Sequence, residues 1–175
     1  MSVLQVQTLQ GPTSGANSNT VLIPETNKLY AKGHVVQVQT YHVGDLSGDI
    51  GTTSTAFQNS GAAVTITPQF SDSLIICDFV TPMSCITYVT VGVLRTRLLL
   101  NNVQYGGDYT TGCMKRSDTA LNSFQPTVFK TVHDGLAAGT AVEFKVQFRS
   151  ELSGEGVILS HINSSITMTV SEVAQ

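Results

Sequence analysis

Residues 142–149, Val-Glu-Phe-Lys-Val-Gln-Phe-Arg, decide the fold class of this 175-residue chain. Apolar and polar side chains alternate at every position of the segment, and neighbouring side chains of a β-strand point to opposite faces of a sheet. The segment therefore predicts a strand with one buried face and one solvated face. The buried face would carry Val142, Phe144, Val146 and Phe148.

The same alternation continues toward the end of the chain and predicts an all-β body. Ile166, Met168 and Val170 alternate with small polar residues. No window has a helical period, and turn signals such as Asn101-Asn102 recur about every ten residues. We expect an antiparallel β-sandwich, jelly-roll-like, over residues 34–175.

Two other segments, residues 74–80 and 88–94, are apolar on both faces of the expected strand. In a sandwich one face of each strand packs on the opposite sheet, so the second face needs another cover. That cover is either an N-terminal arm or another subunit. The pattern therefore predicts self-association.

Residues 1–33 are expected to form an extended arm that docks on a partner surface. The first 24 residues carry no charged side chain, and residues 11–20 are rich in turn-forming types. Two short pieces with strand character flank that stretch and would need a partner to be stable. Their apolar residues, the predicted docking contacts, are Leu4, Val6, Leu9, Val21, Leu22 and Ile23.

Composition and charge exclude several classes of protein. Charged residues make up 12% of the chain and the net charge is −3, so it lacks the basic surface that nucleic-acid binding needs. The densest apolar stretch, residues 91–100, is too short to span a membrane. Two arginines, Arg95 and Arg97, interrupt it; we expect them to pair with carboxylates such as Glu143 or Asp78.

The redox state expected for the cysteines follows from the compartment in which the chain is assembled. The N-terminus has no basic and apolar signal segment, which predicts assembly in a cytoplasm. Cys77, Cys85 and Cys113 are then expected to be reduced thiols in the core. The alternative is a disulfide between Cys77 and Cys85 across a hairpin at Thr81-Pro82.

No pattern predicts an enzyme, a cofactor or a metal site. The nucleophile elbow, the zincin motif and the dinucleotide fingerprint are all absent. The four histidines, at 34, 42, 133 and 161, are too far apart in sequence for one metal, although a site across a symmetry axis stays open. Asp45 and Asp49 lie in a glycine-rich loop that lacks the acidic ladder of a calcium site, so we expect a solvated connection.

One segment has the residue types of a sugar-binding loop. Residues 101–109 combine amides, a carboxylate and two tyrosines near an expected loop tip, including a turn at 105–108. The alternative is a hairpin with cross-strand tyrosines. The candidate residues for contact with a host ligand are Asn102, Tyr105, Asp108 and Tyr109.

Several stretches together resemble the small virion proteins of tailed bacteriophages, especially marine and cyanobacterial ones. The resemblance is carried by residues 4–15, 21–24, 33–38, 66–76, 139–147 and 164–174. It implies a jelly-roll-like domain that forms a homotrimer and is attached to the virion by its N-terminal segment. The matching patterns are loose, and no site residues carry over from the family.

The expected function is therefore a non-enzymatic virion structural protein, located in the virion and assembled in the host cytoplasm. The first hypothesis is a tail-fibre or host-attachment protein, anchored in the tail and binding a host surface glycan or protein with its distal loops. The alternative is a capsid decoration, or cement, protein bound to the major capsid protein. A third is a β-sandwich enzyme or lectin unrelated to phages.

Overall fold

The computed structural model describes residues 31–44, 46–87, 93–112, 125–153, 156–160 and 163–175. The chain divides into two units, residues 1–31 and 32–175, and nearly all the described residues belong to the second. The arm predicted for residues 1–33 lies almost wholly outside the described ranges. Its boundary and its docking contacts stay predictions.

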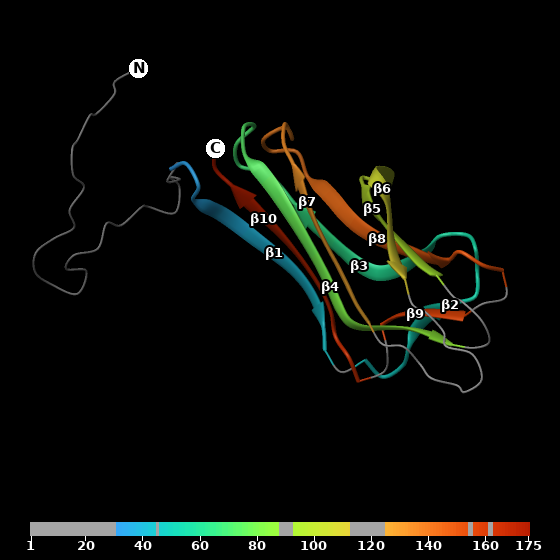
Figure 1. Ribbon diagram of the computed structural model, residues 1–175. Helices are drawn as coiled ribbons and strands as arrows, with labels where there is room; N and C mark the ends of the chain where they lie inside the picture. The colour runs from blue at the N-terminus through green and yellow to red at the C-terminus, as the bar shows by residue number, and fades with distance from the viewer. Residues whose placement is uncertain (1–30, 45, 88–92, 113–124, 154–155, 161–162) are drawn as a thin grey trace, which may run out of the picture. The chain divides into compact units, whose positions relative to one another are not determined.

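The described residues form two antiparallel sheets (Figure 1). The six-stranded sheet contains β1 (Val35–Val43), β10 (Ile166–Val173), β4 (Leu74–Thr87), β9 (Gly156–Ser160) and β2 (Ile50–Thr52), with β7 (Gln125–His133) also paired to β4. The four-stranded sheet runs β3 (Gln58–Ile66), β8 (Val142–Ser150), β5 (Val93–Leu100) and β6 (Val103–Gly112). The all-β, antiparallel prediction is confirmed, whereas the jelly-roll connection and the homotrimer stay predictions. None of the described residues forms a helix that could cross a membrane.

The core lies between the two sheets and follows the alternation that the sequence predicts. Along β8 every second side chain is buried, beginning at Val142. Phe144 and Phe148 are almost fully buried there and pack in one apolar cluster with Phe79 of β4 and Met168 of β10. Such burial contributes about 1.5–3 kcal/mol for each large apolar side chain.

Strand β4 is continuous through Thr81-Pro82, where the disulfide alternative needed a hairpin. Its first half pairs with β10 and β7, and residues 85–87 pair with β9. A register shift between Thr81 and Ser84 brackets Pro82. Because proline cannot donate to the ladder, a shift of this kind allows it inside a strand. Cys77 and Cys85 therefore lie on one strand, which rules out the alternative of a disulfide across a hairpin at Thr81-Pro82.

A tight turn joins β5 to β6. Asn101 and Asn102 both have positive φ, 49° and 65°, as a two-residue hairpin turn requires. The strand resumes at Val103, so the turn expected at residues 105–108 is wrong. Gly106, with φ 74°, lies where the register between β5 and β6 shifts, and it acts as the bulge glycine of a continuous strand.

Glu172 in β10 is a completely buried carboxylate. Its Oε1 accepts hydrogen bonds from the backbone N–H groups of Gln69 (2.8 Å) and Phe70 (3.0 Å) and from Ser73 Oγ (2.8 Å). Its Oε2 accepts one from Gln37 Nε2 at 2.6 Å. Burial by itself raises the pKa of Glu172, but these four hydrogen bonds favour the charged form and together hold the pKa below its ordinary value. The ionised carboxylate thus ties β1 and the loop before β4 to β10.

Cys77 is a buried free thiol, and we expect it to resist alkylation in the native protein. Burial, with a smaller effect of the neighbouring Asp78 carboxylate, raises the pKa of Cys77 to about 12, which leaves roughly one thiolate in ten thousand at pH 8. Iodoacetamide treatment at pH 8 followed by peptide mass spectrometry should find Cys77 unmodified until denaturant is added. Rapid native labelling at Cys77 would contradict this placement in the core.

Candidate interaction surface

The outer face of the sheet formed by β1, β10, β4 and β7 is unusually apolar. Residues that lie opposite one another on paired strands share a face. One row across this sheet is Val38, Ser171, Ile76 and Val132, and another is His42, Thr167, Val80 and Val128. We call this surface the valine face; its exposed valines are Val35 (48%), Val38 (51%), Val80 (39%), Val128 (61%) and Val132 (49%).

Charge is almost absent from the valine face. Between the two apolar rows lies a row of Thr40, Thr169, Asp78 and Lys130, whose charged members form an ion pair of 3.5 Å. The hydroxyl groups of Thr40 and Thr169 lie 3.5 Å apart, within hydrogen-bonding distance of each other. Because its charges form one balanced ion pair and its other polar groups are small, this surface can be covered by a partner without burying an unpaired charge. Exposed apolar patches rimmed by polar residues mark interaction sites.

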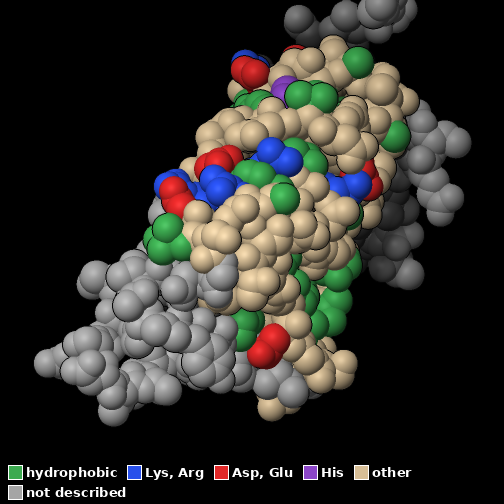
Figure 2. Space-filling view, turned by 90° about the vertical axis from the view of Figure 1, so that its right-hand side faces the viewer, with side chains coloured by type: hydrophobic (Ala, Val, Ile, Leu, Met, Phe, Trp, Pro, Cys, Tyr) green, Lys and Arg blue, Asp and Glu red, His purple; other side chains and the backbone are tan. Residues whose placement is uncertain are grey.

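The opposite outer face, that of the four-stranded sheet, is polar. Figure 2 looks from the right-hand side of Figure 1 and shows Lys, Arg, Asp and Glu side chains gathered in a band. β8 supplies Glu143, Lys145 and Arg149, and the first two form an ion pair of 2.9 Å. The two outer faces of the described sheets therefore differ in character, and of the two the valine face has the composition of a surface that packs against a partner.

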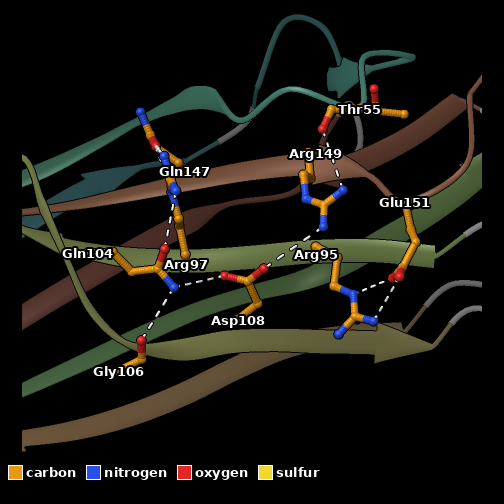
Figure 3. Close-up of polar contacts among 9 residues, drawn as sticks. All are labelled: Thr55, Arg95, Arg97, Gln104, Gly106, Asp108, Gln147, Arg149 and Glu151. Atoms are coloured by element: carbon orange, nitrogen blue, oxygen red, sulfur yellow. Dashed lines mark hydrogen bonds and ion pairs between the residues drawn. The ribbon is translucent and has the colours of Figure 1, made fainter.

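The arginines of this polar face are paired within it (Figure 3). Arg95 forms a bidentate ion pair with Glu151. This hydrogen-bonded pair raises the pKa of Arg95 and lowers that of Glu151. Arg97 donates to Gln147 Oε1, at 2.9 Å from Nε, and to Gln104 Oε1 at 3.2 Å.

The expected carboxylate partner is confirmed for Arg95, although it is Glu151 and neither Glu143 nor Asp78, whereas Arg97 bonds to two glutamine amides. The strand register sets Arg97 opposite Gln147, whereas Asp78 lies on the other sheet and Glu143 is paired with Lys145. The guanidinium of Arg97 also stacks 4.0 Å from the centre of the Phe57 ring. These contacts give the arginines a structural role in holding the polar face together.

The four predicted ligand-contact residues are divided between the core and the surface. Tyr105 and Tyr109 lie within β6 and pack against the core cluster, and the Tyr105 hydroxyl donates to the Val132 carbonyl at 3.2 Å. Asn102 is exposed at the turn, where its Oδ1 accepts from Lys145 Nζ at 3.2 Å. The expected loop tip is thus only the Asn101-Asn102 turn, because the tyrosines have the inward parity of their strand. Sugar binding stays a prediction.

Asp108 belongs to the polar network of the four-stranded sheet. Its carboxylate accepts from Gln104 Nε2 at 3.0 Å and lies 3.9 Å from Arg149 (Figure 3). The other predicted positions are less informative: Asp49 is exposed, whereas Asp45 and the arm residues Leu4, Val6, Leu9, Val21, Leu22 and Ile23 lie outside the described residues. Within the described ranges no three His, Cys, Asp or Glu side chains are grouped so that they could hold a metal ion.

The sequence pattern indicated only part of the valine face. It predicted two-sided apolarity for residues 74–80 but did not single out β7, where Val128, Lys130 and Val132 alternate with Thr127 and Thr131. Thr127 and Thr131 have the inward parity of β7, and Thr127 is buried. A strand that buries threonine and exposes valine was the available signal for this apolar outer face.

Known proteins share little with this chain. No protein-family model and no curated protein matches it. Among solved structures, dimeric latent PorU from Porphyromonas gingivalis is similar with a TM-score of 0.44 and 10% identity, over 84% of this chain and 14% of PorU. The baseplate tripod of bacteriophage Tuc2009 is similar with a TM-score of 0.34 and 13% identity, over 100% of this chain and 80% of the tripod chain. The protein of T=1 particles derived from Infectious Bursal Virus is similar with a TM-score of 0.39 and 12% identity, over 91% of this chain and 42% of that protein. Likenesses this weak assign no function.

Proposed function

We propose that the chain is a non-enzymatic structural protein of a bacteriophage virion, a homotrimeric surface module anchored by its N-terminal arm. The observation that carries the proposal is the valine face, an almost uncharged sheet surface on a chain whose other outer face is polar. Assembly modules bury such surfaces against copies of themselves or against neighbouring virion proteins. The resemblance of six sequence stretches to virion proteins of tailed phages supports the same assignment.

The first candidate position for the module is a tail fibre that binds the host surface. The polar face and the Asn101-Asn102 turn lie on the sheet opposite the valine face, so a trimer held by the valine faces leaves them free. Asn102 is exposed at that turn, and side-chain amides hydrogen-bond to sugar hydroxyls. Three copies would strengthen a weak contact to a host glycan through multivalency.

The second candidate is a capsid decoration protein on the major capsid protein. The inward packing of Tyr105 and Tyr109 favours it, because these tyrosines supplied much of the sequence-based reason for host attachment. A decoration protein needs only surfaces that bind its neighbours, and the valine face and the arm are of that kind. Its role would be to stabilise the head.

A cryo-electron-microscopy map of the phage particle at side-chain resolution tests the proposal. Density for this chain in the particle, with the valine face covered, is the expected result. Density at the tail with the Asn101-Asn102 turns pointing outward selects host attachment, and density across capsomer junctions selects decoration. If infected cells express this chain but the particles purified from the same infection do not contain it, that result would contradict a virion role.

A further inference from the structure

Within the part of the chain that the structure describes, β1 lies at the edge of its sheet, and it carries no protective charge. Among the described strands it is hydrogen-bonded only to β10, and it borders the sheet in Figure 1. Residues 35–43 contain no Asp, Glu, Lys, Arg or Pro. Natural edge strands are shielded by such residues or by a covering segment, because their free backbone N–H and C=O groups attract further strands. β1 is long and uncharged, and so it needs a covering strand.

The sequence contains a near copy of this edge strand. Residues 3–9 read Val-Leu-Gln-Val-Gln-Thr-Leu, and residues 35–41 of β1 read Val-Val-Gln-Val-Gln-Thr-Tyr. Five of the seven positions are identical, and the other two pair a leucine with an apolar or aromatic residue. A segment with the composition of β1 has the same preference for extended backbone in a sheet. It offers the strand that the open edge needs.

We propose that residues 3–9 of a second copy of this chain add to the open edge of β1 as an extra strand. This inference deepens the proposed function by naming the partner of the arm. It rests on one part of that function, namely that copies of the chain assemble with one another. Each copy carries a donor segment and an acceptor edge, so three copies that each donate to the next form a closed ring. Backbone hydrogen bonds would supply the affinity, as in other cases of strand addition.

The register follows from the sequence. Gln37-Val38-Gln39 and Gln5-Val6-Gln7 are the same in both directions, so Val6 lies beside Val38 and glutamine beside glutamine whether the strands run parallel or antiparallel. Opposed β-carbons in such pairs lie about 4.5–5.5 Å apart. Gln39 is exposed and can join a cross-strand glutamine pair, whereas the Gln37 amide stays bonded to Glu172 and the Thr67 carbonyl.

For antiparallel pairing, the length of the connection between the two segments favours a neighbouring copy as the occupant. Residues 10–34 separate the donor from β1, a stretch of 25 residues. Adjacent antiparallel strands of one chain are joined by loops of about two to five residues. An extended stretch of this length reaches about 80 Å, enough to place the donor on another copy.

Disulfide trapping with the purified full-length chain tests the proposal. One preparation carries Val6→Cys, the other carries Val38→Cys and a mass tag, and the two are mixed under mild oxidation. We expect a disulfide that joins position 6 of an untagged chain to position 38 of a tagged chain, identified by peptide mass spectrometry. It should exceed by at least about tenfold the product with Val103→Cys, an exposed valine on β6, because paired strands hold thiols at millimolar or higher effective concentration.

Three outcomes overturn the proposal. The first is no more product than the Val103→Cys control gives. The second is a bond within one chain in the double variant Val6→Cys/Val38→Cys diluted into wild type, which makes the occupant the chain's own arm. The third is a bond between two Val38→Cys chains with none to Val6→Cys, which makes the partner another β1. None of them bears on whether the chain is in the virion, since no particle is used.

Hydrogen exchange gives a second readout that does not depend on cysteine. Val6→Pro removes a backbone donor from the segment, so the amides of β1 should exchange faster by at least about tenfold, while β8 is unchanged. Asn17→Pro is the matched control, because it places a proline in the arm outside the donor segment. Equal exchange of β1 in both variants would overturn the proposal.

Discussion

Replacing Phe144 by alanine is expected to lower the free energy of unfolding by about 3–5 kcal/mol. The side chain is fully buried at the centre of the four-stranded sheet, opposite Val64 of β3 and Leu100 of β5. Truncation removes apolar contact with both sheets and leaves a cavity between layers that can close only in part. Equilibrium urea unfolding followed by circular dichroism measures the change.

Glu143→Ala is the matched control for this experiment. Glu143 neighbours Phe144 in sequence but points to the polar face, where it pairs with Lys145 at 2.9 Å. Loss of an exposed pair of this kind costs less than about 1 kcal/mol. If the two substitutions destabilised the protein equally, the inner and outer faces of β8 would have to be exchanged.

Replacing Glu172 by glutamine is expected to cost about 1.5–3 kcal/mol of stability at neutral pH, the amount associated with a hydrogen bond to a charged group. The amide keeps one acceptor oxygen for Gln69, Phe70 and Ser73 but turns a donor toward the Gln37 amide. Gln37 can rotate to accept this donor only by giving up its own bond to the Thr67 carbonyl. Some buried polar group is then left unsatisfied.

The pH dependence of this difference identifies the carboxylate as its cause. The pKa of Glu172 is lower in the folded chain than its ordinary value of 4.5, so its stabilising effect is fully present above pH 4.5. The effect is lost as the pH falls through the lower folded pKa. Wild type and Glu172→Gln should therefore converge in stability in acid, as seen by urea unfolding at a series of pH values. A gap that stayed constant or widened on acidification would contradict the assigned ionisation.

The sequence predicts the elements of this fold better than their pairing. The alternation of residues 142–149 is enough to identify β8 and its inner face, since each side chain reports its own environment. Thr81-Pro82 and Gly106-Gly107 resemble turns, yet they lie at register shifts inside β4 and β6. Local sequence does not distinguish a bulge from a turn, because the difference is whether the partner strand continues.

The contacts of the interaction surface depend on which strands are neighbours. Arg95 was expected to pair with a carboxylate such as Glu143 or Asp78. It does pair with a carboxylate, but this is Glu151, which follows the neighbouring strand, and only the strand order brings the two together. The inward orientation of Glu172 could have been predicted, because it has the parity of the buried Ile166, Met168 and Val170. A charge at the end of a strand is usually solvated, and nothing in the sequence identifies the four distant donors that bury this one.

The mass of the purified protein in solution tests most directly whether the valine face is covered by another copy. Sedimentation equilibrium should show a trimer for wild type. Val128→Asp should weaken association by at least about a hundredfold, because burying an unpaired carboxylate costs about 3 kcal/mol or more. Val103→Asp, at a residue 70% exposed on β6, should stay trimeric, whereas Val128 is 61% exposed on the valine face. A monomeric wild type, or a Val128→Asp variant that associates as wild type does, would contradict the account.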